Sequence, residues 1–219
     1  MGKNCFMIID QQKDFNLEGA PYRVDCGLEA LPYIKKALEA SRKAGIPVVH
    51  VFRYYRADGS DVELTRYFGF HKVGGGCVPG TEGAEECDEI KPIEGEYLVV
   101  KQRWSAFFQT ECDMLLRRLG VTQIIVSGVQ TPNCVRGTVW DANSLDYEVI
   151  VLTDATGAKT PEVHQANLFD MANIGIKMMT TDEYCKALEE GGPASTLIDE
   201  IRADMAGKKI APEPVVLYK

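Results

Sequence analysis

The chain has 219 residues, of which 45% are hydrophobic and 26% charged, a composition typical of a soluble globular protein. Its formal net charge is -8 and its pI is near 5.0, whereas binding to nucleic acid or to an anionic membrane would favour a basic face. Charge therefore excludes nucleic acid and membrane as the main partners and favours a small molecule.

The N-terminus leads into the apolar run Cys5–Ile9 without a charged leader or a small-residue cleavage site, so we expect a cytoplasmic protein. Seven cysteines are widely spaced and form no CxxC pair. This spacing predicts reduced thiols in a reducing compartment, with no disulfide framework and no zinc module.

Short apolar runs alternate with stretches of helical periodicity, which predicts repeated βαβ units. Continuous Val and Ile runs indicate strands that are buried on both faces of a mostly parallel sheet. The strands are expected at Cys5–Ile9, Ile46–Phe52, Tyr97–Val100, Gln123–Ser127, Glu148–Leu152 and Ile176–Met179. The helices are expected at Gly27–Ala44, Thr110–Leu119, Pro132–Leu145, Pro161–Ile174 and Thr181–Glu190. The predicted fold is α/β, a three-layer α/β/α sandwich around a twisted, Rossmann-like sheet of about six strands, in one domain over residues 1–219.

Two regions depart from this alternation. Residues 54–92 hold several glycines and few aliphatic residues, so we expect a long excursion over the sheet edge whose residues shape a pocket. Ala194–Ala206 is a candidate further helix, and the end of the chain, residues 205–219, is a candidate extended tail for subunit contact.

The stretch Gly128–Val135 converts an apolar strand into what resembles the first turn of a helix, with Thr131 as N-cap and Pro132 at the first helical position. Cys134 then lies in the first turn, where free backbone N–H groups favour a thiolate. The stretch alone leaves two readings open, a nucleophile and a buried structural cysteine.

Two further residues follow predicted strands directly, where ligands bind in open parallel sheets. Asp10 follows Ile9, and Lys101 follows Val100. Each one alone is explained by a turn cap or a solvated lysine. Together with Cys134 they supply a base, a cation and a nucleophile, which predicts a site for attack on a carbonyl group.

Other chemistries lack their motifs. There is no HExxH, no GxSxG and no P-loop, and the glycine run 74–76 follows no predicted strand. The histidines are expected to be structural, so we predict neither a metal site nor a cofactor; they are His50, His71 and His164.

Three segments in this order resemble the isochorismatase-like cysteine hydrolases, a family that includes nicotinamidases, N-carbamoylsarcosine amidases and ureidoacrylate amidohydrolases. The resemblance covers nearly the whole chain, and its segments are Ile8–Phe15, Lys101–Phe107 and Gly128–Val135, with a further match at Leu152–Ala155. It implies a triad of Asp10 as base, Lys101 as the orienting charge and Cys134 as nucleophile, with a covalent acyl intermediate. It also implies a cis peptide between Val129 and Gln130, an oxyanion hole formed by the Gln130 and Cys134 amides, and a homo-oligomer, either dimer or tetramer.

The departures from the family pattern narrow the expected substrate. Nicotinamidases carry a metal-binding Asp-x-His after the second strand, and residues 51–58 offer none. Vinyl ether hydrolysing isochorismatases commonly lack the cysteine, so Cys134 favours cleavage of a C–N bond in an amide, carbamoyl or ureido group. Isochorismatase-type ether hydrolysis and a non-catalytic binding or thiol-redox protein remain as alternatives.

The substrate pocket is less well defined by the sequence. We expect it to be lined by Phe15, Trp104, Phe107, Val129 and Gln130, although the three aromatic rings are equally suited to the core. Four arginines lie near the expected pocket mouth as candidate carboxylate receptors or solvated surface residues; they are Arg53, Arg56, Arg66 and Arg103.

Overall fold

The structure is a computed structural model that describes residues 3–193, 197–206 and 208. It contains a six-stranded sheet in the order β3-β2-β1-β4-β5-β6, and every neighbouring pair is parallel. The strands are β1 (Lys3–Ile9), β2 (Val48–Arg53), β3 (Tyr97–Lys101), β4 (Val121–Val129), β5 (Glu148–Gly157) and β6 (Lys177–Met179). The predicted α/β fold and its parallel sheet are therefore confirmed.

The central strand β1 shows why the sheet is buried on both faces. Cys5, Met7 and Ile9 belong to one hydrophobic cluster, whereas Phe6 and Ile8 belong to another. All five are fully buried. Alternate side chains of a strand point to opposite faces, so an unbroken apolar run requires a covering layer on each side.

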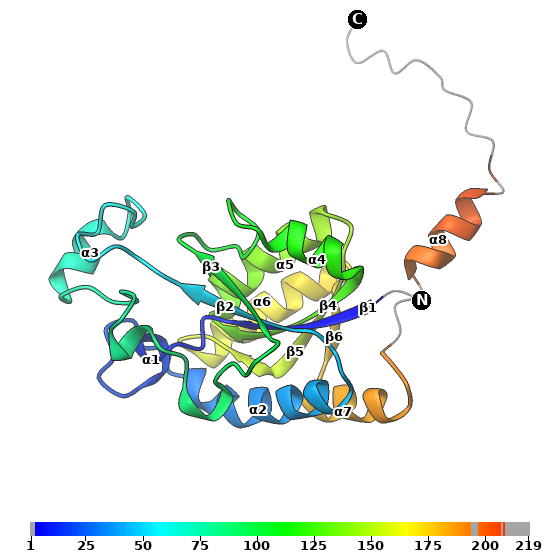
Figure 1. Cartoon of the computed structure of the whole chain (residues 1–219), viewed down its shortest axis with the longest axis horizontal. Coiled ribbons are helices and arrows are strands. Elements are labelled where there is room, and N and C mark those ends of the chain that lie inside the picture. Colours follow the sequence, from blue (N-terminus) through cyan, green and yellow to red (C-terminus); the bar gives the residue numbers. More distant parts are fainter. Residues whose placement is uncertain (1–2, 194–196, 207, 209–219) are drawn as a thin grey trace, which may run out of the picture.

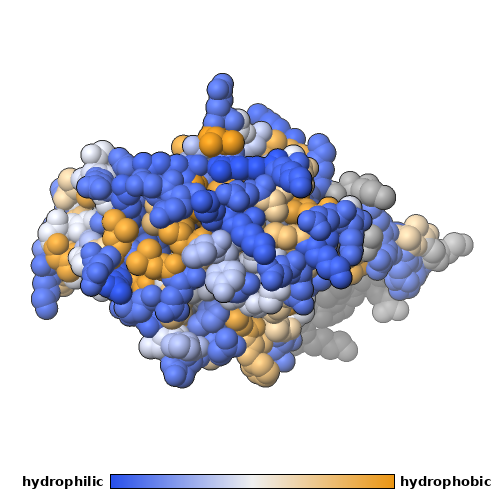
Figure 2. All heavy atoms as spheres, turned by 90° about the horizontal axis from the view of Figure 1, so that it is seen from below, coloured by the Kyte–Doolittle hydropathy of each residue, from blue (hydrophilic) through white to orange (hydrophobic). Residues whose placement is uncertain are grey.

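Helices supply these two layers (Figure 1). One face is covered by α2 (Gly27–Lys43) and α7 (Thr181–Glu189), and the other by α4 (Cys112–Leu119), α5 (Arg136–Ser144) and α6 (Pro161–Asn173). The face with α2 and α7 is seen in Figure 2, where polar side chains dominate the surface and apolar ones form separate patches. Among the described residues, no helix has both the length and the apolar character needed to cross a membrane.

Residues 54–92 form the expected excursion, but they are not without secondary structure. They contain α3 (Tyr67–Lys72) and two short 3₁₀ turns, Glu82–Ala84 and Asp88–Ile90. Figure 1 shows α3 projecting beyond the sheet. A further short helix that the sequence did not predict, α1 (Lys13–Asn16), follows β1.

The last described helix, α8 (Leu197–Ala206), falls within the predicted helix 194–206 and lies apart from the sheet in Figure 1. The remainder of the predicted tail, apart from residue 208, is outside the described residues.

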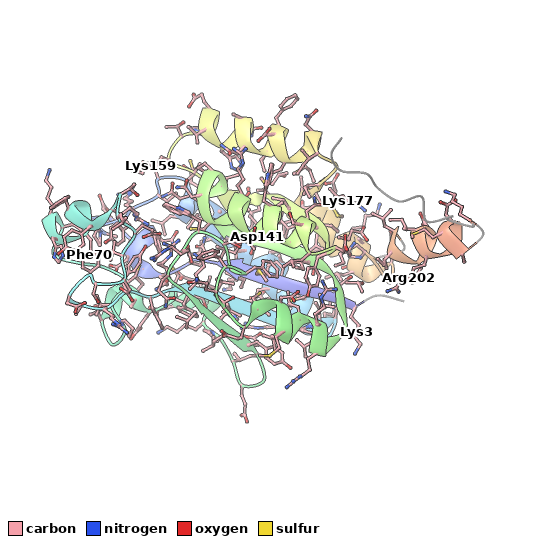
Figure 3. All side chains as sticks on the ribbon, turned by 90° about the horizontal axis from the view of Figure 1, so that it is seen from above. Lys3, Phe70, Asp141, Lys159, Lys177 and Arg202 are labelled. Carbon is pink, nitrogen blue, oxygen red and sulfur yellow. The ribbon has the colours of Figure 1, made fainter. Side chains whose placement is uncertain are left out.

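Figure 3 distinguishes the two ends of the sheet. Lys3 and Lys177 lie at the amino ends of β1 and β6, whereas Lys159, just after β5, and Phe70 of α3 lie at the opposite end. The excursion therefore extends from the carboxyl ends of the strands.

The chain reverses its direction of sheet building between β1 and β4, which are neighbours in the sheet but distant in sequence. A crevice at such a switch point is the usual ligand site of an open parallel sheet. Gly128 is needed for the close approach of the two strands there, because a Cβ atom at this position would lie 2.1 Å from the Ile9 carbonyl oxygen. Its φ of +108° also disfavours any other residue.

Candidate active site

The carboxyl edge of the sheet brings the three candidate catalytic residues together. Asp10 directly follows β1, Lys101 ends β3, and Cys134 lies five residues beyond the end of β4. Strand β2 lies between β1 and β3, and its last residue, Arg53, is in register with Lys101. Two cationic side chains therefore start from neighbouring strand ends beside Asp10.

Asp10 and Lys101 form a buried ion pair. The Lys101 Nζ atom lies 2.7 Å from Asp10 Oδ2, and the two side chains are 0% and 1% exposed. The same ammonium group also donates to the Arg103 carbonyl oxygen over 3.3 Å. The second carboxylate oxygen, Asp10 Oδ1, is buried without a hydrogen-bond partner among the described residues. One oxygen is thus held by lysine while the other is free to accept a proton.

Cys134 lies in a π-helical turn, η3 (Thr131–Val135), that continues into α5. The N-cap is Gln130 rather than the expected Thr131, because a wider turn begins at once after β4 and Val135 N donates to Gln130 O over 3.1 Å. The Val129–Gln130 peptide bond is cis.

The neighbours of the Cys134 thiol have opposite effects on its pKa. Cys134 is only 4% exposed, and burial raises the pKa of its thiol, as does the negative charge of Asp10. Lys101 and Arg53 act in the opposite direction and lower this pKa, but the balance is a raised value. The local helix geometry therefore does not by itself hold a thiolate, and the resting thiol keeps its proton.

A hydrogen-bonded histidine anchors the turn that carries Cys134. His164 Nε2 lies 3.1 Å from the Thr153 carbonyl oxygen and must donate to it, so His164 Nδ1 accepts from Thr131 Oγ1 at 2.8 Å. Burial lowers the pKa of His164, which favours this neutral form. These hydrogen bonds fit the structural role expected for His164, since the side chain, which belongs to α6, links η3 to β5.

Arg53 is the residue that the sequence interpretation placed wrongly. It is fully buried instead of being at a pocket mouth, and its Nη2 atom lies 3.2 Å from Cys134 Sγ. Its Nη1 atom donates to Glu63 Oε1 over 2.6 Å and to the Tyr55 hydroxyl over 2.5 Å. The sequence did contain a signal, since Arg53 directly follows the predicted strand Ile46–Phe52, as Asp10 and Lys101 follow theirs.

The five expected pocket residues have different surroundings. Phe15 and Val129 are buried in one small cluster with Tyr55, and Gln130 is half-buried. Trp104 is 37% exposed, and the Arg53 guanidinium lies 5.2 Å from its ring centre. Phe107 packs against Tyr147, with ring centres 5.8 Å apart, so its ring contact is a core contact. Their role in binding substrate remains a prediction.

A surface cavity of about 580 Å³ lies beside this site. Its walls come from the segment after β3 and from η3 and α5, and include Trp104, Ser105, Pro132 and Asn133. Asp10, Lys101 and Cys134 do not line it. In this structure the three side chains are buried and are not part of the cavity wall.

The segment after β2 does not fit the metal site of nicotinamidases. Those enzymes carry Asp-x-His after the second strand, whereas residues 51–58 of this chain contain none, and the first residue beyond β2 is Tyr54, directly after Arg53. A guanidinium group has no lone pair to donate to a metal, and its charge repels a cation. The described residues also contain no group of three or more His, Cys, Asp or Glu side chains placed to hold a metal ion.

The fold and site define an α/β protein with a carboxylate, an ammonium group and a thiol at the sheet switch point. A model of the isochorismatase domain matches residues 4–183. The chain therefore belongs to the isochorismatase family, as the resemblance in sequence implied.

Individual relatives agree with this assignment. The chain is 45% identical over 188 residues to a probable inactive nicotinamidase of Arabidopsis thaliana, covering 84% of this chain and 95% of the relative. It is 26% identical over 212 residues to the ureidoacrylate amidohydrolase of Agrobacterium fabrum, covering 88% and 93%. The crystal structure of an isochorismatase family protein from Desulfovibrio vulgaris aligns with a TM-score of 0.80 and 44% identity, covering 93% of this chain and 100% of that one.

Proposed function

We propose that this protein is a cysteine-dependent hydrolase that cleaves a C–N bond of a small amide, carbamoyl or ureido compound. The observation that carries the proposal is the buried Asp10–Lys101 pair beside Cys134, with Asp10 Oδ1 unpartnered among the described residues. A buried carboxylate with one free oxygen next to a protonated thiol has the arrangement of a general base and its nucleophile.

The reaction follows from these groups. Asp10 Oδ1 takes the proton from Cys134 Sγ as the sulfur attacks the substrate carbonyl carbon, and Lys101 keeps the carboxylate in place. The oxyanion is stabilised by the backbone amides of Gln130 and Cys134. Collapse of the tetrahedral intermediate breaks the C–N bond, and the amine leaves with the proton held by Asp10. Water, deprotonated by Asp10, then hydrolyses the thioester and releases the acid.

Two considerations support C–N cleavage over the alternatives. Ureidoacrylate amidohydrolase, a relative named above, is by its name a C–N hydrolase. Vinyl ether hydrolysis needs no thiol at the position of Cys134. The residues after β2 do not fit a nicotinamidase metal, so we propose a substrate that is hydrolysed without one.

The name of the Arabidopsis relative favours a second candidate, a protein of this fold that binds small molecules without turning them over. In such a protein Asp10, Lys101 and Cys134 would hold a ligand, and no acyl intermediate would form. Cytoplasmic location and homo-oligomeric assembly also stay as predictions.

Intact mass spectrometry separates the two candidates. Incubation of the protein with pooled amides and ureides is expected to add an acyl group to Cys134 and to release ammonia or an amine. Cys134→Ala should show neither result, whereas Cys185→Ala, which changes a half-buried thiol on α7, should show both. Binding of a pool member without adduct or release would support the binding protein and contradict the hydrolase.

A further inference from the structure

Arg53 reaches the nucleophile from a strand that the proposed triad does not use. It is the last residue of β2, between the strands that end at Asp10 and Lys101. Its side chain is among the largest that are fully buried, and Nη2 lies 3.2 Å from Cys134 Sγ. Desolvation of a guanidinium is costly, so its position beside a reactive sulfur needs a reason.

The charges around Cys134 form two pairs. Lys101 has Asp10, and Arg53 has Glu63, whose side chain is only 10% exposed. Burial raises the pKa of Glu63, but the Arg53 charge and the hydrogen bond from Tyr55, with smaller contributions, together outweigh burial, and the balance is a lowered pKa. Glu63 is therefore ionised and holds Nη1, which leaves Nη2 directed at the sulfur.

Other contacts fix the guanidinium without competing for the thiol. Burial raises the pKa of Tyr55, so its hydroxyl remains protonated and donates to Glu63 Oε2 over 2.6 Å. The ring of Trp104 lies 5.2 Å from both the Arg53 and the Arg66 guanidinium carbons. The Arg53 backbone is held by Gln12, whose side chain both accepts from Arg53 N over 2.7 Å and donates to Arg53 O over 2.9 Å.

We propose that Arg53 is a fourth catalytic residue, a second cation that carries the negative charge of Cys134 once Asp10 has taken its proton. A neutral thiol accepts hydrogen bonds weakly, whereas a thiolate forms a strong charge-assisted bond with a guanidinium. The Nη2–H group therefore stabilises the sulfur more when it is charged, both before attack and when the thiolate is expelled. This inference rests on the proposed cysteine mechanism and adds a group that the Asp-Lys-Cys triad does not contain.

Alkylation of Cys134 tests this role without any substrate. The rate of iodoacetamide modification, followed by mass at the peptide that holds Cys134, gives the apparent pKa of the thiol in the full-length protein. Arg53→Gln is expected to raise this pKa by about 1–3 units, the usual effect of one nearby opposite charge. Arg53→Lys, which keeps the charge but loses the planar contact, should raise it less. Arg56→Gln changes an exposed arginine and should leave it unaltered.

Glu63→Gln distinguishes an electrostatic role from a structural one. It breaks the same ion pair but leaves the Arg53 charge without its counter-ion. The pKa of the Cys134 thiol should therefore fall in Glu63→Gln, whereas it should rise in Arg53→Gln. The proposal would be overturned if the thiol pKa shifted in the same direction in both variants, or if Arg53→Gln left the pH profile of Cys134 alkylation unchanged. Either result would count against it even if the wild type hydrolyses amides. If circular dichroism shows that Arg53→Gln does not fold, the Glu63→Gln variant decides alone. Only a fall in the thiol pKa of Glu63→Gln agrees with the proposal. Failure to find any amide substrate would overturn the proposed hydrolase function, but it would leave the expected shifts of the thiol pKa to be tested separately.

Discussion

Replacement of Lys101 by methionine is expected to lower turnover by about 10²–10⁴-fold and the free energy of unfolding by about 3–5 kcal/mol. The large stability effect arises because the fully buried Asp10 carboxyl would lose its ion-pair partner, which lies 2.7 Å away. Urea unfolding and steady-state kinetics at pH 7 measure the two quantities. Lys35→Met, which changes an exposed lysine on α2, is the matched control and should alter neither by much.

A double variant separates charge balance from chemistry. Asp10→Asn combined with Lys101→Met removes both charges, so we expect most of the lost stability to return. Activity should not return, because an amide cannot take the Cys134 proton. Recovery of turnover in the double variant would show that Asp10 is not the base, and an unfolding free energy no higher than that of Lys101→Met would show that the pair does not determine stability.

The sheet could be predicted from sequence because its central strands β1, β2 and β4 are apolar runs that are almost wholly buried, whereas the edge strands β3 and β6 are partly exposed. The ends of the strands were harder to predict from the sequence. Strand β5 was expected to end at Leu152 but continues to Gly157, with a register shift against β4 between Val126 and Gly128. Irregular pairing of this kind depends on the neighbouring strand and has no local sequence pattern.

A candidate site residue could be predicted where its position directly after a strand in the sequence fixes its place at the edge of the sheet. Asp10 and Lys101 were found because carboxyl ends of parallel strands share an edge, and the structure brings both to Cys134. Arg53 met the same criterion but was expected at the pocket mouth or in solvent, since arginine is rarely buried without a partner. Its partner Glu63 comes from the irregular excursion, and no periodicity links two residues across such a segment.

The excursion also shows why Arg53 and a buried histidine belong to one network. Gln12, which holds the Arg53 backbone, pairs with Glu86 in an isolated antiparallel bridge. Glu86 Oε2 lies 2.8 Å from His50 Nδ1, and Glu96 Oε2 lies 3.0 Å from His50 Nε2. Both ring nitrogens face carboxyl oxygens, and these partners raise the pKa of His50, which favours the imidazolium ion in which both nitrogens donate. The bridge places Glu86, which contacts His50, opposite Gln12, which holds the strand end that carries Arg53.

The ionisation of this group sets a pH dependence. Burial by itself lowers the pKa of His50, but the hydrogen bonds with Glu86 and Glu96 and the charges of these two carboxylates together outweigh burial, and the balance is a raised pKa. Burial raises the pKa of Glu96, but the hydrogen bonds from Arg42, the Ile93 amide and His50 together outweigh burial and lower this pKa to about 2. A histidine with a raised pKa contributes stability fully below its unfolded value of about 6.5 and loses it as the pH rises through the folded value.

His50→Gln is therefore expected to reduce the free energy of unfolding by about 3–5 kcal/mol near pH 6, because the buried Glu86 carboxyl loses its partner 2.8 Å away. The difference from wild type should shrink as the pH rises above the folded pKa of His50, where the wild type has itself lost the imidazolium charge. Urea unfolding in steps from pH 6 to pH 9 measures this difference. His71→Gln, which changes an exposed histidine on α3, should give curves parallel to wild type.

Addition of Glu86→Gln to His50→Gln should recover part of the stability near pH 6, because the buried carboxyl group that lost its partner is then gone. The alkylation rate of Cys134 adds a functional readout, since loosening of Glu86 and Gln12 displaces the Arg53 backbone. We expect slower alkylation near neutral pH in His50→Gln than in His71→Gln. A difference between His50→Gln and wild type that grows with pH would show that the buried histidine is neutral and would refute the imidazolium assignment.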